Sequence, residues 1–207
     1  MPGRKRRAEP ARFWRRLPWA LLGAALVWLA VRSGYNAVLT NTAQGLCRLG
    51  ESPAVTQISS DGEAAIIGRM DMRADSGRLR FSLTQIHFNF VPFLALVLAL
   101  PGWSRKGGWQ GLVSALLLLT ISHVMSLLWH VQYFYATALG PWSVANYSAF
   151  SREVLGGLQY FFDIAVTFTL PLLLWVGFFS QPVSSVLGLG DSGADRRIGD
   201  GAKEGGS

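Results

Sequence analysis

The sequence predicts a mostly α-helical integral membrane protein, with four transmembrane helices and a small antiparallel β segment between the first and second helix. Of the 207 residues, 50% are hydrophobic and only 15% are charged, whereas soluble domains carry about a quarter charged residues. The mean hydropathy is +0.29. The apolar residues also gather in long runs, which is typical of membrane spans. This composition excludes a disordered chain and argues against a soluble enzyme.

The positive charge is concentrated at the start of the chain. Residues 1–16 contain seven basic residues and one acidic residue, directly before an apolar run. Basic residues in this position hold their end of a helix in the cytoplasm and attract anionic lipid. We therefore expect residues 1–16 to be a basic cytoplasmic arm that meets the lipid bilayer. This explanation of the high pI of 10.2 is favoured over binding of nucleic acid.

Hydropathy places the four spans at residues 17–39, 86–102, 111–131 and 155–180. A bilayer core of about 30 Å needs about 20 helical residues, so the first span extends past Arg32, which would snorkel toward the headgroups. A cleaved signal peptide is the alternative, but no small-residue cleavage site closely follows that run. The second span is short and contains Pro92. The turn at 103–110 holds Arg105 and Lys106, which mark it as cytoplasmic, so both termini are expected in the cytoplasm.

Residues 40–85 differ from the spans and are predicted to form an extracytoplasmic β segment. Short runs at 55–59, 64–72 and 78–83 are separated by Ser-Asp-Gly and Asp-Ser-Gly turns, which predicts a three-stranded antiparallel meander. Fewer than 50 residues bury little core of their own, so the segment is expected to lean on the helices or a partner. Residues 132–154 form an extracytoplasmic loop, and residues 181–207 a disordered cytoplasmic tail.

Two ionisable side chains inside the spans are predicted to form an intramembrane polar pair. Asp163 lies about eight residues into the fourth span and His123 seven or eight residues before the outer end of the third. Both positions are about 12 Å below the outer surface at 1.5 Å per residue. Sequential antiparallel helices touch, so a contact between His123 and Asp163 would satisfy both groups. Hydrogen bonding between helices is the simpler role for such a pair.

Further polar side chains fall near the outer ends of the spans and could line one outer polar cleft. The candidates share this position and their hydrogen-bonding capacity; they are His87, Asn89, Ser126, His130, Glu153 and Gln159. Interfacial, partly solvated positions explain the histidines equally well. No catalytic residue, metal ligand or cofactor is predicted, and a single cysteine excludes an intrachain disulfide.

Three functions are compatible with this pattern. The first is a non-enzymatic accessory or assembly subunit that docks on another integral membrane protein. The second is a haem- or quinone-binding redox subunit, with His87 and His130 as axial ligands and His123 as a substitute. The third is a membrane-surface thiol enzyme using Cys47, which would need a nearby base and a positive environment. The first needs no catalytic constellation and is favoured.

The layout resembles the exosortase H-associated membrane protein family. The likeness covers roughly residues 12–180: a basic start, a first span, a short outer β-rich segment, and the sequence IHFNFVPFLAL at 86–96 that enters the second span. The resemblance implies a multi-pass helper in the bacterial inner membrane, whose partner is an exosortase that sorts proteins with C-terminal membrane anchors. It carries over no site residue. Cys47 lies before the later spans, away from the position expected for an exosortase nucleophile.

Overall fold

The computed structural model describes residues 8–72, 78–104 and 107–188. The long helices are α2 (Ala8–Leu49), α5 (Gly108–Thr137), and a continuous run of α7 (Ala149–Tyr160), the π-helical segment η1 (Phe161–Val166) and α8 (Thr167–Phe178). Short helices are α3 (Leu83–His87), α4 (Phe90–Ala99), α6 (Pro141–Asn146) and α9 (Ser180–Leu187). The strands are β1 (Thr56–Asp61), β2 (Ala64–Arg69) and β3 (Leu79–Ser82). Residues 1–7 of the predicted arm, 73–77 of the β segment, 105–106 of the turn and 189–207 of the tail lie outside the described residues.

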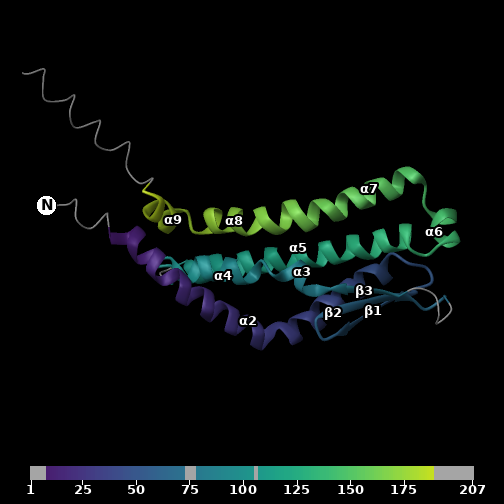
Figure 1. Ribbon diagram of the computed structural model, residues 1–207, viewed down its shortest axis with the longest axis horizontal. Coiled ribbons are helices and arrows are strands. Elements are labelled where there is room, and N and C mark those ends of the chain that lie inside the picture. The colour runs from purple at the N-terminus through teal and green to yellow at the C-terminus, as the bar shows by residue number, and fades with distance from the viewer. Residues whose placement is uncertain (1–7, 73–77, 105–106, 189–207) are drawn as a thin grey trace, which may run out of the picture.

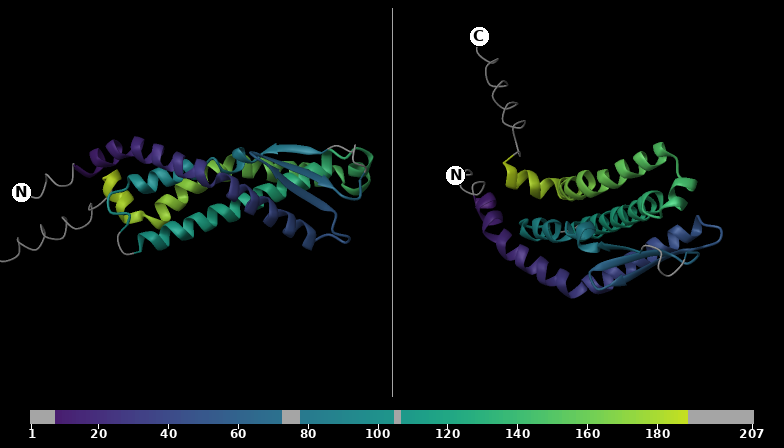
Figure 2. Two further views of the ribbon diagram at one scale, coloured as in Figure 1. Left: turned by 90° about the horizontal axis from the view of Figure 1, so that it is seen from below. Right: turned by 45° about the vertical axis from the view of Figure 1, so that its right-hand side comes forward.

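The chain runs four times along the long axis of the molecule (Figure 1). Helix α2 leads away from the N-terminus, α3 and α4 return, α5 leads out again, and α7–η1–α8 returns. The start of α2 and helix α9 lie at one end, here called the terminal end, and the sheet and α6 lie at the other, here called the sheet end. Helices α4 and α5 lie between α2 with the sheet on one side and α7–η1–α8 on the other (Figures 1 and 2).

Three helices in the described part of the chain are long and apolar enough to cross a membrane: Pro10–Leu49, Gly108–Thr137 and Ala149–Phe178. The expected mostly α-helical membrane protein is confirmed to that extent. The second predicted span, 86–102, is instead built from two short helices, α3 and α4, joined at Phe88 and Asn89. Together they cover Leu83–Ala99, about 26 Å at 1.5 Å per residue. Pro92 falls in the first turn of α4, where its missing N–H costs no helical hydrogen bond.

Several helices extend beyond the limits that hydropathy set. Helix α2 continues ten residues past 39, α5 ends at Thr137 rather than 131, and α7 begins at Ala149 rather than 155. The start of α7 is capped, because the Ser148 hydroxyl accepts a hydrogen bond from the Ser151 N–H at 3.1 Å. Residues 181–187, predicted as the start of a disordered tail, are helical in α9. Packing and capping, which hydropathy does not record, set these ends.

The predicted three-stranded antiparallel meander is confirmed. The strand order is β1-β2-β3, with Ile58 opposite Ile67 and Ile66 opposite Arg80. One face of the sheet buries Ile58, Ala65 and Ile67 in a hydrophobic cluster with Leu39 of α2 and Leu127 of α5. The small sheet therefore owes its core to the two helices, as its length requires.

Helix α2 also seals the free edge of β1 with polar side chains. The Asn36 amide donates to the Gly62 carbonyl at 3.0 Å, and the Arg48 Nε–H donates to the Thr56 carbonyl at 2.8 Å. The Gln44 side-chain oxygen accepts from the Ile58 N–H at 2.7 Å. The contact at Gly62 places the β1–β2 turn beside the middle of α2. The hairpin thus points toward the terminal end. It fills the space beside α2 that the short α3–α4 segment does not reach.

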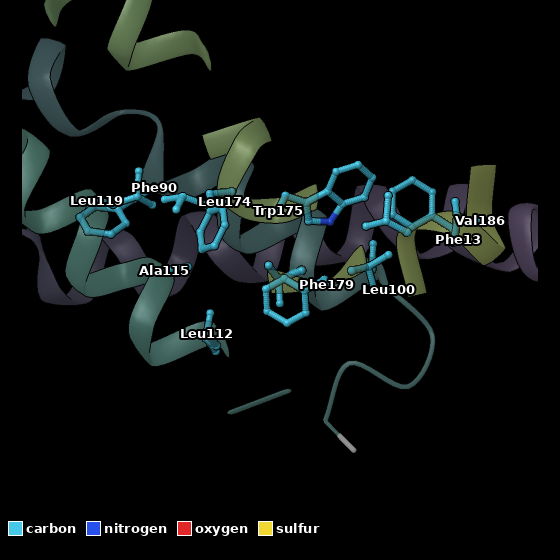
Figure 3. Packing of buried hydrophobic residues seen from close by; sticks show 14 residues of the cluster. Phe13, Phe90, Leu100, Leu112, Ala115, Leu119, Leu174, Trp175, Phe179 and Val186 are labelled. Carbon is cyan, nitrogen blue, oxygen red and sulfur yellow. The ribbon is translucent and has the colours of Figure 1, made fainter. Parts of the chain in front are cut away.

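A second hydrophobic cluster holds the terminal end together. Phe13 of α2, Leu100 after α4, Leu119 of α5 and Trp175 of α8 are all buried in it (Figure 3). Helix α5 starts tightly here, because Gly107 has a φ of 90° and a Cβ on Gly108 would overlap the Trp103 carbonyl oxygen. Both glycines are therefore needed for the turn between α4 and α5.

Arg69 ties the sheet to the helices at the sheet end. Its guanidinium donates two hydrogen bonds to Asp71, at 3.0 and 2.8 Å. It also lies over the rings of Trp142 and Tyr135, 4.2 and 5.1 Å from their centroids. The hydrogen bonds from Arg69 hold the pKa of the Asp71 carboxyl below its usual value. Because the folded pKa is lowered, the pair stabilises the fold above the unfolded pKa and loses this effect as the pH falls.

We predict that Asp71→Asn lowers the free energy of unfolding by less than about 1 kcal/mol at neutral pH, because the pair is partly exposed. The difference from the wild type should shrink as the pH falls below about 3.9, the unfolded value for Asp. Thermal unfolding of both proteins in detergent across pH measures it. Asp61→Asn is the matched control, because its pair with Arg80 is more exposed. A difference that stays constant down to the lowest pH would contradict the prediction.

Candidate functional site

A continuous chain of hydrogen bonds crosses the bundle and touches all four passes. The Tyr35 hydroxyl of α2 lies 2.7 Å from His123 Nδ1 of α5. His123 Nε2 lies 2.8 Å from the side-chain oxygen of Asn89, between α3 and α4. The Asn89 amide then donates to the main-chain carbonyl of Thr167, at 3.2 Å. His123 and Asn89 are each 2% exposed, so this polar chain replaces water as the partner of buried groups.

The last bond of the chain follows from a proline. In an α-helix the Thr167 carbonyl would accept from the N–H of residue 171, but that residue is Pro171 and has no N–H. A free carbonyl in an apolar interior costs several kcal/mol unless another donor reaches it. Asn89 supplies that donor from a neighbouring pass. The Thr167 hydroxyl donates to the Phe162 carbonyl at 2.8 Å, and that carbonyl also accepts from the Thr167 main-chain N–H across the wide turn of η1.

The donors and acceptors along the chain agree with a single arrangement of protons. The Asn89 amide nitrogen donates to Thr167, so its oxygen is free to accept from His123 Nε2–H. In a neutral His123 imidazole, Nδ1 is then the acceptor for the Tyr35 hydroxyl and the proton lies on Nε2. Every polar atom of His123 is therefore used for contact between helices.

The predicted contact between His123 and Asp163 is wrong, and the direction of the side chains explains why. Helix α5 and the α7–η1–α8 run are antiparallel, with Gly156 against Tyr133 and Gly111 against Phe178, a register that puts Asp163 level with Ser126. Side chains on a helix tilt toward its N-terminus. Asp163 therefore tilts toward the sheet end, whereas His123 tilts toward the terminal end, and the two diverge.

Asp163 instead meets His130, about two turns beyond His123 along α5. Asp163 Oδ2 lies 3.4 Å from His130 Nε2, and the His130 side chain is 3% exposed against 38% for Asp163. His130 Nδ1 lies 2.9 Å from the Ser126 carbonyl, and the ring of Phe81 from β3 stacks on the imidazole at 4.0 Å. The pair sits where the helix widens into η1. Such π-helical segments are frequent at functional sites.

The remaining candidates for an outer cleft lie in separate places. His87 is 1% exposed, has no hydrogen-bond partner among the described residues, and packs against Trp28 and Tyr35 with centroids 4.6 and 5.8 Å away. Glu153 is exposed and lines a groove of about 310 Å³ between α5 and α7. Gln159 is half-buried one turn before Asp163. The Ser126 hydroxyl is buried without a hydrogen-bond partner in the described part of the chain.

These positions bear on the other two functional hypotheses. His87 and His130, the suggested axial pair, are enclosed by different aromatic neighbours, Trp28 and Phe81. Cys47 is 6% exposed in the hydrophobic cluster of the sheet end and shares a cavity with Glu51. A reactive cysteine needs a positive environment, whereas Glu51 is acidic. Within residues 8–72, 78–104 and 107–188, no three His, Cys, Asp or Glu side chains gather to hold a metal ion.

Sequence reasoning missed two groups that organise these contacts. Tyr35 closes the polar chain on α2, and no sequence pattern singles out one tyrosine in an apolar run. Glu51 accepts from the N–H groups of Val55 and Thr56, both at 2.9 Å, and so fixes the start of β1. The Thr167 carbonyl was within reach of prediction, because Pro171 in a span always frees the carbonyl four residues before it.

We predict that Asn89→Leu lowers the free energy of unfolding by about 1–2 kcal/mol, because it strands His123 Nε2–H and the Thr167 carbonyl without partners. Thermal unfolding in a mild detergent measures the loss. Asn146→Leu is the matched control, since the exposed Asn146 bonds only the Trp142 carbonyl and should change stability by less than about 0.5 kcal/mol. Equal stability of the two variants would show that the chain of hydrogen bonds through Asn89 does not stabilise the fold.

No family model, no curated protein and no solved structure matches the chain. The resemblance to the exosortase H-associated membrane protein family therefore stays a prediction from the sequence. The roles of the polar residues rest on their own geometry.

Proposed function

We propose that the protein is a four-pass, non-enzymatic accessory subunit that docks on another integral membrane protein. The proposal has two parts, the topology of the chain and the docking surface. In this topology both termini face the cytoplasm, the sheet end lies outside, and the membrane is the inner membrane of a bacterium. The basic residues of the N-terminal arm and of the turn before α5 support this orientation.

The path of the chain supports the fourth pass. The chain must return from β3 at the sheet end to the start of α5 at the terminal end, and α3 with α4 makes that return (Figure 1). The α3–α4 segment is short because the β1–β2 hairpin occupies the space beside α2 toward the sheet end, where the Asn36 amide bonds the Gly62 carbonyl. The Arg32–Glu63 ion pair sits at the tip of the hairpin and lets Arg32 neutralise its charge near the outer surface of the bilayer.

The observation that carries the docking role is an apolar stripe on α7 and η1, formed by Phe150, Val154, Phe161 and Ile164. Successive members are four, seven and three residues apart, which keeps them near one helix face, and they are 77%, 43%, 53% and 45% exposed. Helix α7 buries none of its residues. A long apolar face without cover typically marks a contact surface for another protein.

The run from the stripe's first residue, Phe150, to Phe178 at the end of α8 is longer than the hydrocarbon core of a bilayer is thick. Phe178 packs near Gly111 at the terminal end, and Phe150 lies 28 residues before it, about 42 Å away at 1.5 Å per residue. The hydrocarbon core is about 30 Å thick. If lipid covers Phe178, then Phe150 stands about 12 Å beyond the opposite boundary. Lipid therefore accounts for Phe161 and Ile164, but Phe150 and Val154 need a protein partner.

The sequence resemblance supplies the class of partner. A helper of an exosortase-type protein-sorting system would lie beside a multi-pass enzyme whose spans and outer loops offer an apolar face. The α7 stripe, which continues from the bilayer into the outer space, suits such a neighbour. The exosortase is therefore the first partner to test.

The topology predicts that Ser59 and Ser104 lie on opposite sides of the membrane. Both are exposed, and Cys47→Ser provides a background without cysteine, because Cys47 is the single cysteine of the chain. We expect a membrane-impermeant maleimide to label Ser59→Cys in spheroplasts. Ser104→Cys should label only after the membrane is opened. Labelling of both from the same side would show that residues 83–99 do not cross.

The docking role predicts that polar substitutions in the stripe release the partner. In native membranes, the tagged double variant Phe150→Ser, Val154→Ser should co-purify several-fold less of a stoichiometric membrane protein than the wild type, because it loses apolar contact area. Leu49→Ser is the matched control, since Leu49 is 84% exposed at the sheet end but outside the stripe. Equal recovery of the partner with all three proteins would contradict the proposal.

A further inference from the structure

A second apolar surface lies on the other side of α5, where a cavity of about 270 Å³ opens between α5 and the end of α2. Its apolar lining comes from Leu46 and Cys47 of α2 and from Met125, Leu128 and Trp129 of α5. Water occupies about 30 Å³ per molecule and needs polar partners. The cavity is thus far larger than one water site and offers a water molecule few hydrogen bonds. It calls for an apolar occupant.

The cavity continues the face of α5 that lies open below it. Val113, Leu117 and Ile121 are 62%, 59% and 50% exposed, and they recur every four residues along this face. The next position in the series is Met125, the first cavity residue. An elongated apolar ligand lying on this exposed face can therefore extend into the cavity. It passes no charged side chain, because residues 111–131 contain no Asp, Glu, Lys or Arg.

The depth of the cavity matches the outer boundary of the hydrocarbon core. Trp109 is 59% exposed at the terminal end, as interfacial tryptophans are. Met125 lies about 24 Å from it along the helix, and Gln132 about 35 Å. A core of about 30 Å therefore ends between these two cavity residues. The lower part of the cavity is apolar and within the core, while Gln132 and Glu51 form a polar rim beyond it.

From this order we infer that the cavity binds one acyl chain of a phospholipid from the leaflet at the sheet end. The acyl chain of the lipid lies along Met125 and Leu128, and the Gln132 amide contacts the ester groups of the lipid at the rim of the cavity. A partner helix does not fit, because a helix with side chains is about 10 Å across, whereas the cavity holds only about 270 Å³. Glu51 takes no part in holding the lipid, since its carboxylate already serves the start of β1.

The test uses the full chain in vesicles of phosphatidylcholine that carries a photoreactive diazirine on one acyl chain. Peptide mapping after irradiation should find more adducts at residues 46–47 and 125–132 than at residues 113–121. Leu128→Trp fills the cavity and should reduce the adducts at residues 46–47 and 125–132 about fivefold or more. Leu117→Trp, on the same face below the cavity, should leave them unchanged. Adducts spread evenly along α5, or unaffected by Leu128→Trp, would overturn the inference.

A second measurement needs no variant and covers the case in which Leu128→Trp folds poorly. Cys47 lines the cavity and is the single cysteine, so its alkylation by N-ethylmaleimide reports whether the cavity is occupied. Phosphatidylcholine present at ten times its dissociation constant leaves about a tenth of the sites open. We expect alkylation to be about tenfold slower in such bilayers than in a short-chain detergent, at unchanged fold by circular dichroism. Equal rates in the two media would overturn the inference.

Discussion

The structure depends on one chain of hydrogen bonds that pairs polar groups inside an apolar bundle. Pro171 frees the Thr167 carbonyl, Asn89 reaches it, and Asn89 is held in turn by His123. His123 completes the chain through Tyr35 of α2. These contacts join four passes that lipid alone would leave free to rotate, because apolar surfaces gain little by leaving lipid for one another. The polar chain therefore fixes the rotation of each helix, and the hydrophobic clusters fill the space around it.

Once the helices are fixed, the other surfaces follow from their lengths. The short α3–α4 segment leaves room for the hairpin, which α2 holds through Asn36, and the sheet takes its core from the same helices. The long α7–η1–α8 run carries its exposed apolar stripe toward the sheet end, and the end of α2 leaves the cavity beside α5. The His130–Asp163 pair marks the point where the last run changes from α to π geometry. The proposed docking surface, the cavity proposed to bind lipid and the buried polar chain thus occupy different parts of one bundle.

The amino-acid sequence predicts the class of this fold well and its polar contacts poorly. Hydropathy identified the long helices, and turn residues identified the three strands, because both signals are local. His123 and Asp163 were singled out as a pair, but His123 is buried whereas Asp163 is 38% exposed. The partners of both depend on the antiparallel register and on the tilt of each side chain. The second span was placed as one helix because hydropathy does not register the break at Asn89. Tyr35 and Glu51 act through distant or main-chain partners, which leave no trace in spacing.

The sealed edge of β1 has a consequence for the order in which the chain assembles. Three side chains of α2 hold backbone groups of residues 56–62, and α2 leaves the ribosome before those residues do; the side chains are those of Asn36, Gln44 and Arg48. The α2 side chains that bond the edge of β1 are therefore already synthesised when the hairpin leaves the ribosome, before α5 is made and covers the face of the sheet. An unpaired strand edge is an invitation to aggregation, and here it is occupied from the start. The edge of β1 is therefore protected from pairing with other chains until the later helices complete the fold.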